Sequence, residues 1–202
     1  MSSASWIRDL LAWRAERLPV RLWLPLAATL WLASGSLTTI GGILALGLVA
    51  FLRLWDDLAD REDDAVREPE RVLPRSDPRP FRVAAAVIGF ACAGLVASGP
   101  SPVPRLLAFV ALAGALAAWY AGLRRRVGPV PGYHVLLAKY PAAILVLGAE
   151  RSVTTAAAAV YLGLLVYEVA HDARLRSLGR ARAAALVEAP LLIGVLLGRI
   201  AS

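Results

Sequence analysis

The chain has 202 residues, of which 58% are hydrophobic and 18% charged, and its mean hydropathy is +0.62. This composition is too apolar for a water-soluble domain of this length, so a lipid bilayer is the expected solvent. Although the formal net charge is +7, the basic residues lie between apolar segments, where membrane topology explains them, and we expect no nucleic-acid partner.

About seven apolar segments are expected to cross the membrane, because about 20 apolar residues span the hydrocarbon core. Residues 1–20 precede them as a cytoplasmic amphipathic segment, and residues 56–80 form a cytoplasmic segment rich in Asp and Arg. The predicted fold class is therefore all-α: one polytopic transmembrane helical bundle over residues 1–202. The expected spans are residues 21–35, 37–55, 81–99, 103–122, 133–149, 153–171 and 184–200.

Arginine is distributed unevenly between the loops. Most arginines lie before the first span or directly after the second, fourth and sixth spans, whereas the opposite loops hold only Arg105 and Arg151, with Arg199 at the far end. The positive-inside rule describes this asymmetry. It predicts a multi-pass protein of the inner, cytoplasmic membrane, with its N-terminus in the cytoplasm.

The second span leads into a dense acidic run from Asp56 to Asp64. If the helix continues through this run, Asp57, Asp60 and Asp64 share one face, because residues at i, i+3 and i+7 are neighbours on a helix. Carboxylates suit Mg²⁺, which typically takes one or two of them together with phosphate oxygens. The run therefore predicts a site for Mg²⁺ and a diphosphate. The alternative is a charged loop whose acids pair with the nearby Arg61, Arg67, Arg71 and Arg75.

A second acidic pair, Glu168 and Asp172, lies at the end of the sixth span. The second and sixth spans run in the same direction, so both acidic ends emerge on one side of the membrane. The basic residues 124–126 follow the fourth span on that side. Lys139 lies within the fifth span, and an ionisable residue at membrane depth faces a bundle interior, a pathway or a partner unless it snorkels to the interface.

The run from Asp56 to Asp64, with the turn Pro69-Glu70-Arg71-Val72-Leu73-Pro74-Arg75 that follows it, resembles the first motif of the UbiA superfamily of intramembrane prenyltransferases. That family's pattern is Asn/Asp-Asp-x-x-Asp-x-x-x-Asp, followed by a turn similar to Asn/Glu-Arg-Pro-Leu. The resemblance implies that Asp57, Asp60 and Asp64 are catalytic Mg²⁺ ligands. It places Arg71 at the turn arginine, whereas Val72 departs from the usual proline.

The resemblance also implies a second metal-binding motif, Asp-x-x-x-Asp, formed here by Glu168 and Asp172, with Asp172 also catalytic. The predicted diphosphate-binding residues are Arg71, Arg124, Arg125 and Lys139. This motif departs from the family because Glu replaces the leading Asp and the acids that often follow are absent. The family usually has nine helices, so a chain with about seven has a more open cavity or is completed by a second copy in a homo-oligomer.

The expected function is therefore that of a Mg²⁺-dependent enzyme that ionises an isoprenyl diphosphate and transfers the prenyl group to a lipophilic acceptor, for example an aromatic one. A terpene cyclase of the UbiA type, which needs no acceptor, is the first alternative. The second is a non-catalytic membrane protein with a degraded second motif. A transporter is disfavoured because its coupling charges are expected near the membrane midplane, where only Lys139 is a candidate.

Overall fold

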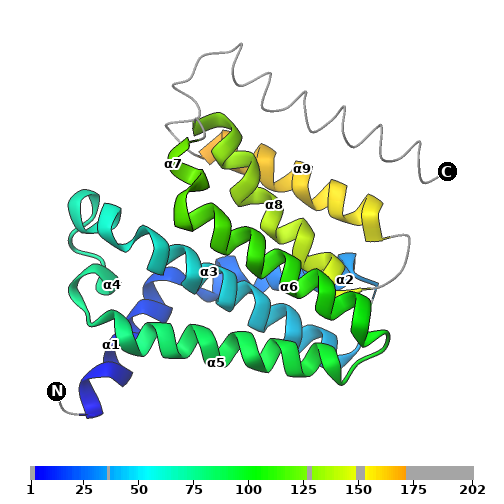
Figure 1. Cartoon of the computed structure of the whole chain (residues 1–202), viewed down its shortest axis with the longest axis horizontal. Coiled ribbons are helices and arrows are strands. Elements are labelled where there is room, and N and C mark those ends of the chain that lie inside the picture. Colours follow the sequence, from blue (N-terminus) through cyan, green and yellow to red (C-terminus); the bar gives the residue numbers. More distant parts are fainter. Residues whose placement is uncertain (1–2, 36, 127–128, 149–152, 172–202) are drawn as a thin grey trace. The chain divides into compact units, whose positions relative to one another are not determined.

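The computed structural model describes residues 3–35, 37–126, 129–148 and 153–171 (Figure 1). Every regular element in these ranges is helical, which confirms the all-α prediction for this part of the chain. In chain order the helices are α1 (Ser3–Arg17), α2 (Val20–Ala33), α3 (Thr39–Arg67), α4 (Val72–Arg75), α5 (Pro78–Ala97), α6 (Pro102–Ala118), the π-helix η1 (Trp119–Leu123), α7 (Arg124–Arg126), α8 (Pro129–Leu147) and α9 (Val153–His171).

Three of the described helical segments are long and apolar enough to cross a membrane: Thr39–Arg67, Pro78–Ala97 and Pro102–Leu123. They coincide with the predicted spans 37–55, 81–99 and 103–122. The predicted spans 21–35, 133–149 and 153–171 also fall on helices, but the apolar parts of these are shorter. Residues 184–200, the last predicted span, lie outside the described residues, so the total of about seven spans stays a prediction.

Two of the long helices expose stripes of large apolar side chains. On α5, Val83, Val87 and Phe90 are 62%, 61% and 79% exposed, and their spacing places them on one helix face. On α6, Val103, Leu107 and Val110 form an equivalent stripe. A water-soluble monomer rarely exposes contiguous apolar surface of this kind, so these stripes are consistent with contact with lipid.

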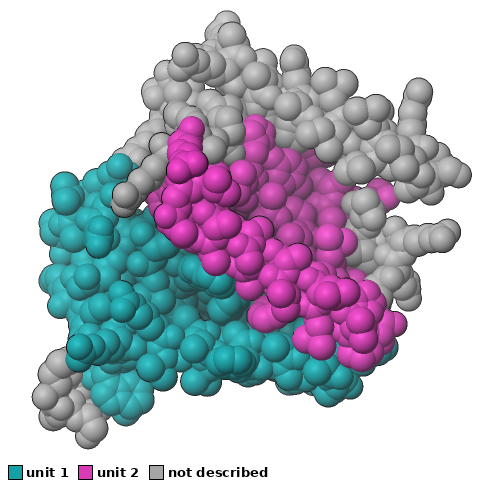
Figure 2. Space-filling view, viewed as in Figure 1, with its two compact units in different colours: residues 1–28, 38–100 teal, residues 29–37, 101–202 magenta. Residues whose placement is uncertain are grey.

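The chain divides into two compact units, coloured separately in Figure 2: residues 1–28 with 38–100, and residues 29–37 with 101–202. In the first unit, α3 lies beside α5, and α1 contacts α4 and α5 (Figure 1). In the second unit, α8 packs against both α6 and α9.

Two glycines allow α3 and α5 to approach closely. A Cβ atom on Gly47 would lie 2.9 Å from the Sγ of Cys92, and one on Gly89 would lie 3.0 Å from the ring of Phe51. Small residues at such contacts let helix backbones pack closely, which drives association where lipid replaces water. Cys92 is consequently buried in this contact.

Local signals at both ends set the length of α3, which runs from Thr39 to Arg67. The hydroxyl oxygen of Thr38 accepts a hydrogen bond from the Gly41 N–H at 3.0 Å, which caps the N-terminus. The helix ends at Arg67, since Glu68 precedes Pro69 and a residue before proline is driven out of the helical conformation. Between these ends the helix is unbroken, so the acidic run continues directly from the apolar span.

In the second unit, a buried arginine joins two helices. The Nε–H of Arg105 on α6 donates a hydrogen bond of 2.8 Å to the carbonyl oxygen of Val146, in the last turn of α8. The last carbonyls of a helix lack partners within the helix, and a cation near them also interacts favourably with the helix dipole. Arg105 therefore caps the C-terminal end of α8 from a neighbouring helix.

Candidate functional site

The acidic run lies at the C-terminal end of α3, in the first unit. Because the helix is continuous through Arg67, the prediction that Asp57, Asp60 and Asp64 lie on one helix is confirmed. Asp57 is 4% exposed, whereas Asp60 and Asp64 are half-buried. The face is therefore most deeply buried at Asp57, the end nearest the apolar part of the helix.

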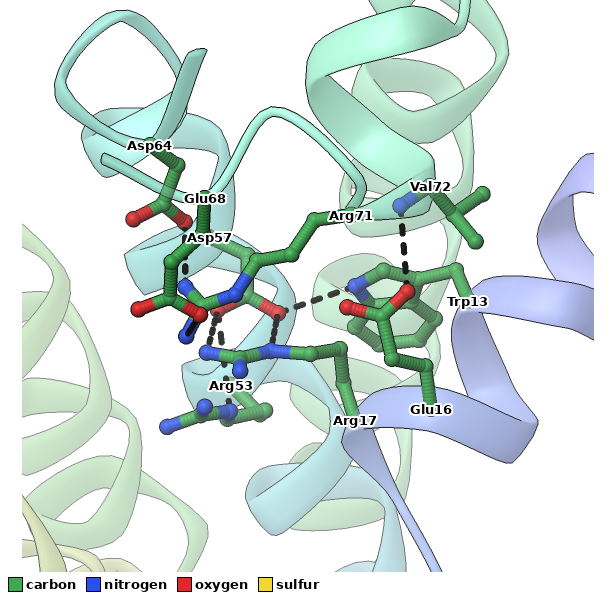
Figure 3. Close-up of polar contacts among 9 residues, drawn as sticks. All are labelled: Trp13, Glu16, Arg17, Arg53, Asp57, Asp64, Glu68, Arg71 and Val72. Carbon is green, nitrogen blue, oxygen red and sulfur yellow. Dashed lines mark hydrogen bonds and ion pairs between the residues drawn. The ribbon is translucent and has the colours of Figure 1, made fainter. Parts of the chain in front are cut away.

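The carboxylate of Asp57 is bound by three hydrogen bonds from α1 (Figure 3). The Trp13 indole N–H donates to Oδ2 at 2.9 Å, and Arg17 donates from Nε to Oδ2 at 3.0 Å and from Nη2 to Oδ1 at 2.8 Å. The Nε of Arg53 lies 3.6 Å from Oδ1, close enough for an ion pair but too far for a hydrogen bond. Two guanidinium groups thus lie beside one buried carboxylate.

The pairing is also visible in the protonation of Arg17. Burial by itself lowers the pKa of this guanidinium. The hydrogen bonds and charge of Asp57, with the charges of Asp64 and Glu16, outweigh burial and raise the pKa above its ordinary value. Arg17 is therefore charged at all physiological pH values.

Helix α1 is held at two further points. The ring of Trp13 meets Phe81 of α5 edge to face, with centroids 6.4 Å apart and planes at 75°. Glu16 accepts a hydrogen bond of 3.0 Å from the backbone N–H of Val72, the first residue of α4. One helix of the cytoplasmic segment predicted for residues 1–20 is thereby attached to α3, α4 and α5.

Asp64 and the turn that follows α3 are joined by Arg71. The Nη1 of Arg71 donates to Oδ2 of Asp64 at 2.6 Å, and its Nη2 pairs with Glu68 (Figure 3). This contact brings together two residues that the family resemblance assigns to one site. It also confirms for Arg71 the alternative interpretation that nearby arginines pair with the acids.

The neighbouring arginines act differently. Arg61 donates to the backbone carbonyls of Leu73, Pro74 and Ser76 at 3.2–3.3 Å, which ties the turn to α3. Arg75 donates to backbone carbonyls as well, within its own turn. Arg61, Arg71 and Arg75 thus hold the turn after α3 in a folded arrangement.

The other predicted site residues lie in the second unit. Arg124 is half-buried in α7, and the side chain of Arg125 lies outside the described residues. Lys139 is 5% exposed on α8, with its Nζ 5.0 Å from the ring centroid of Tyr140. The Glu168 side chain and Asp172 also lie outside the described residues.

Three residues around Asp57 were not predicted from the sequence: Trp13, Arg17 and Arg53. A local signal for the first two exists, since Trp13 and Arg17 are four residues apart and share one face of α1. Arg53 likewise precedes Asp57 by one turn of α3. The sequence shows these faces, but it does not show that the face of α1 meets that of α3.

Comparisons with models of known protein families, with curated proteins and with solved structures found no match to this chain. The resemblance to the UbiA superfamily therefore rests on the motif residues themselves. The geometry of those residues is what bears on function.

The carboxylates of Asp60 and Asp64 are of the chemical type that Mg²⁺ prefers as ligands. Three of about four acceptor positions on Asp57 are used by Trp13 and Arg17. Arg71 donates to Oδ2 of Asp64, and Asp60 lies one turn away on the same face. Within the described residues, no three His, Cys, Asp or Glu side chains are grouped to hold a metal. A pair of carboxylates suffices for Mg²⁺ when phosphate oxygens complete its coordination.

Proposed function

We propose that this chain is a Mg²⁺-dependent enzyme of the membrane that ionises an isoprenyl diphosphate and transfers the prenyl group to a lipophilic acceptor. The observation that supports the proposal is the continuity of α3. One helix carries an apolar stretch long enough to span a bilayer and then, without a break, the acidic face of Asp57, Asp60 and Asp64. A charged headgroup at this face would have its apolar tail in or beside the membrane.

In this proposal Asp60 and Asp64 hold the cation, and Arg71 fixes the orientation of the Asp64 carboxylate through their 2.6 Å contact. Bound Mg²⁺ would neutralise charge that develops on the diphosphate leaving group. Arg71 lies beside the same carboxylate and would contribute positive charge toward that group. The roles predicted from the sequence for Glu168, Asp172, Arg124, Arg125 and Lys139 stay predictions.

The proposal includes a topology. About seven spans, with the N-terminus in the cytoplasm, would place the acidic end of α3 on the cytoplasmic side of the inner membrane. The arginine asymmetry between loops supports this orientation. The exposed apolar stripes of α5 and α6 support the placement of both helices in lipid.

The test is incubation of the purified protein in detergent with labelled geranyl, farnesyl and geranylgeranyl diphosphates, with and without Mg²⁺. The measurements are diphosphate release and the mass of the products. Release only when a lipophilic acceptor is added is the expected result. Release with a cyclised product and no acceptor would identify a terpene cyclase instead. If none of the three is consumed in a Mg²⁺-dependent manner, the enzymatic proposal is wrong.

Two variants test the site within this assay. Asp60→Asn and Asp64→Asn each remove a charged oxygen ligand, and we expect each to lower the rate at least about a hundredfold, as loss of a group that stabilises developing charge does. Glu62→Gln is the matched control, because Glu62 belongs to the same run but is exposed on another face of α3. Equal rates in all three variants would show that the acidic face takes no part in the reaction.

A further inference from the structure

Asp57 is buried, whereas Asp60 and Asp64 on the same face are half-buried. Its carboxylate accepts three hydrogen bonds from α1 and has a second guanidinium, that of Arg53, 3.6 Å from Oδ1. A cation bound by this carboxylate would find only about one acceptor position left, beside the guanidinium of Arg17. It would also lie close to Arg53, against the repulsion of that charge.

We infer that Asp57 is a positioning residue that anchors α1, and not a ligand of the cation. The part of this inference that concerns the cation rests on the proposed function. The part that concerns α1 does not, because it follows from contacts within the first unit. The family resemblance assigns Asp57 to the metal, so the inference separates this chain from that pattern.

The need for an anchor follows from the length of α1. A helix of 15 residues is marginal in water by itself, so tertiary contacts must hold it. Asp57 supplies the most polar of these contacts, and Phe81 supplies an apolar one to the ring of Trp13. Trp13 is 4% exposed as a result, although it belongs to an otherwise largely exposed helix.

The anchored helix in turn supports the turn that carries Arg71. Glu16 lies three residues after Trp13 on α1. Its carboxylate accepts a hydrogen bond from the backbone N–H of Val72, the residue directly after Arg71. Arg71 then contacts Asp64. A continuous series of contacts thus leads from Asp57 through α1 to the Arg71–Asp64 pair. Asp57 acts on the proposed cation site by holding this series in place.

The two possible roles of Asp57 predict opposite effects of Arg17→Gln on cation binding. If Asp57 only anchors α1, Asp57→Asn and Arg17→Gln both release α1, and both disturb the Arg71 turn to a similar degree. If Asp57 is a cation ligand, Asp57→Asn removes a ligand, whereas Arg17→Gln removes a competing positive charge and favours the cation.

The experiment uses the full chain in detergent and two measurements. Binding of Mn²⁺, a paramagnetic substitute for Mg²⁺, is followed by electron paramagnetic resonance. Hydrogen exchange of the α1 amides, followed by mass spectrometry, reports whether α1 is docked, and exchange of α5 confirms that the rest of the unit is folded. Glu62→Gln is the control for both measurements.

We expect Asp57→Asn and Arg17→Gln each to accelerate exchange in α1 at least about tenfold. Each should weaken Mn²⁺ binding by a similar factor of about ten, as loss of a group that orients a metal ligand does. Trp13→Phe keeps the ring against Phe81 and removes only the N–H, so it should accelerate exchange less. It also provides the test if Asp57→Asn does not fold.

Loss of Mn²⁺ binding in Asp57→Asn together with tighter binding in Arg17→Gln would overturn the inference. Unchanged exchange of α1 in both variants would overturn it as well. If the unmodified protein binds no Mn²⁺, the proposed function loses its cation site. The exchange rates then decide alone whether Asp57 anchors α1.

Discussion

The pair of Asp57 and Arg17 should make a large, measurable contribution to the stability of the first unit. The perturbation is a double-mutant cycle of Asp57→Ala, Arg17→Ala and the double variant. Two hydrogen bonds join the pair, at 2.8 and 3.0 Å. The side chains are 6% and 17% exposed, so solvent screens this interaction less than it screens an ordinary surface pair.

Hydrogen bonds to charged groups contribute about 1.5–3 kcal/mol each. Because Arg17 is partly exposed, we expect a coupling free energy near the lower end, about 3 kcal/mol for the two bonds. Asp57→Ala alone should cost about 3–5 kcal/mol, since it removes the acceptor of the buried Trp13 indole N–H and of the largely buried Arg17 guanidinium. Arg53→Ala is the control, and at 3.6 Å with 32% exposure it should cost about 0–1 kcal/mol.

The assay is reversible unfolding in mixed detergent micelles, titrated with a denaturing detergent and followed by circular dichroism. The free energy of unfolding is compared among the four members of the cycle. A coupling below about 1 kcal/mol, no more than a surface pair provides, would refute the reasoning. So would an Arg53→Ala variant as unstable as Asp57→Ala.

Three further changes test the packing. Gly47→Ala should lower the free energy of unfolding by about 1–3 kcal/mol, because the new Cβ would lie 2.9 Å from the Sγ of Cys92. Adding Cys92→Ala should restore most of this loss. Additive effects of the two substitutions would contradict the close contact. Arg61→Ala removes three hydrogen bonds to backbone carbonyls, so limited proteolysis should cut residues 68–77 faster, with Arg79→Ala, an exposed arginine, as the control. Arg105→Met should destabilise the second unit by about 1–3 kcal/mol, because the carbonyl of Val146 loses the Arg105 donor. A thermal midpoint equal to that of the unmodified protein would show that the cap contributes nothing.

The sequence by itself determined the helices and the face of α3. Apolar segments of sufficient length, the cap at Thr38 and the stop before Pro69 act over a few residues, so they can be read in order along the chain. The spacing of Asp57, Asp60 and Asp64 fixes a common face once the helix is known to continue. The common face was predicted correctly because helix geometry alone relates its three residues.

The choice of ionic partners was decided only by the tertiary structure. Many arginines lie near the acidic run in sequence, and the guanidinium group of any of them could pair with a carboxylate. Asp57 instead takes Arg17, 40 residues away in the chain, while the nearer Arg61 donates to backbone carbonyls. The docking of Trp13 on Phe81 and of Glu16 on Val72 sets which guanidinium reaches the carboxylate. Charge attracts without regard to sequence position, so the packing of α1 against its neighbours selects the pair.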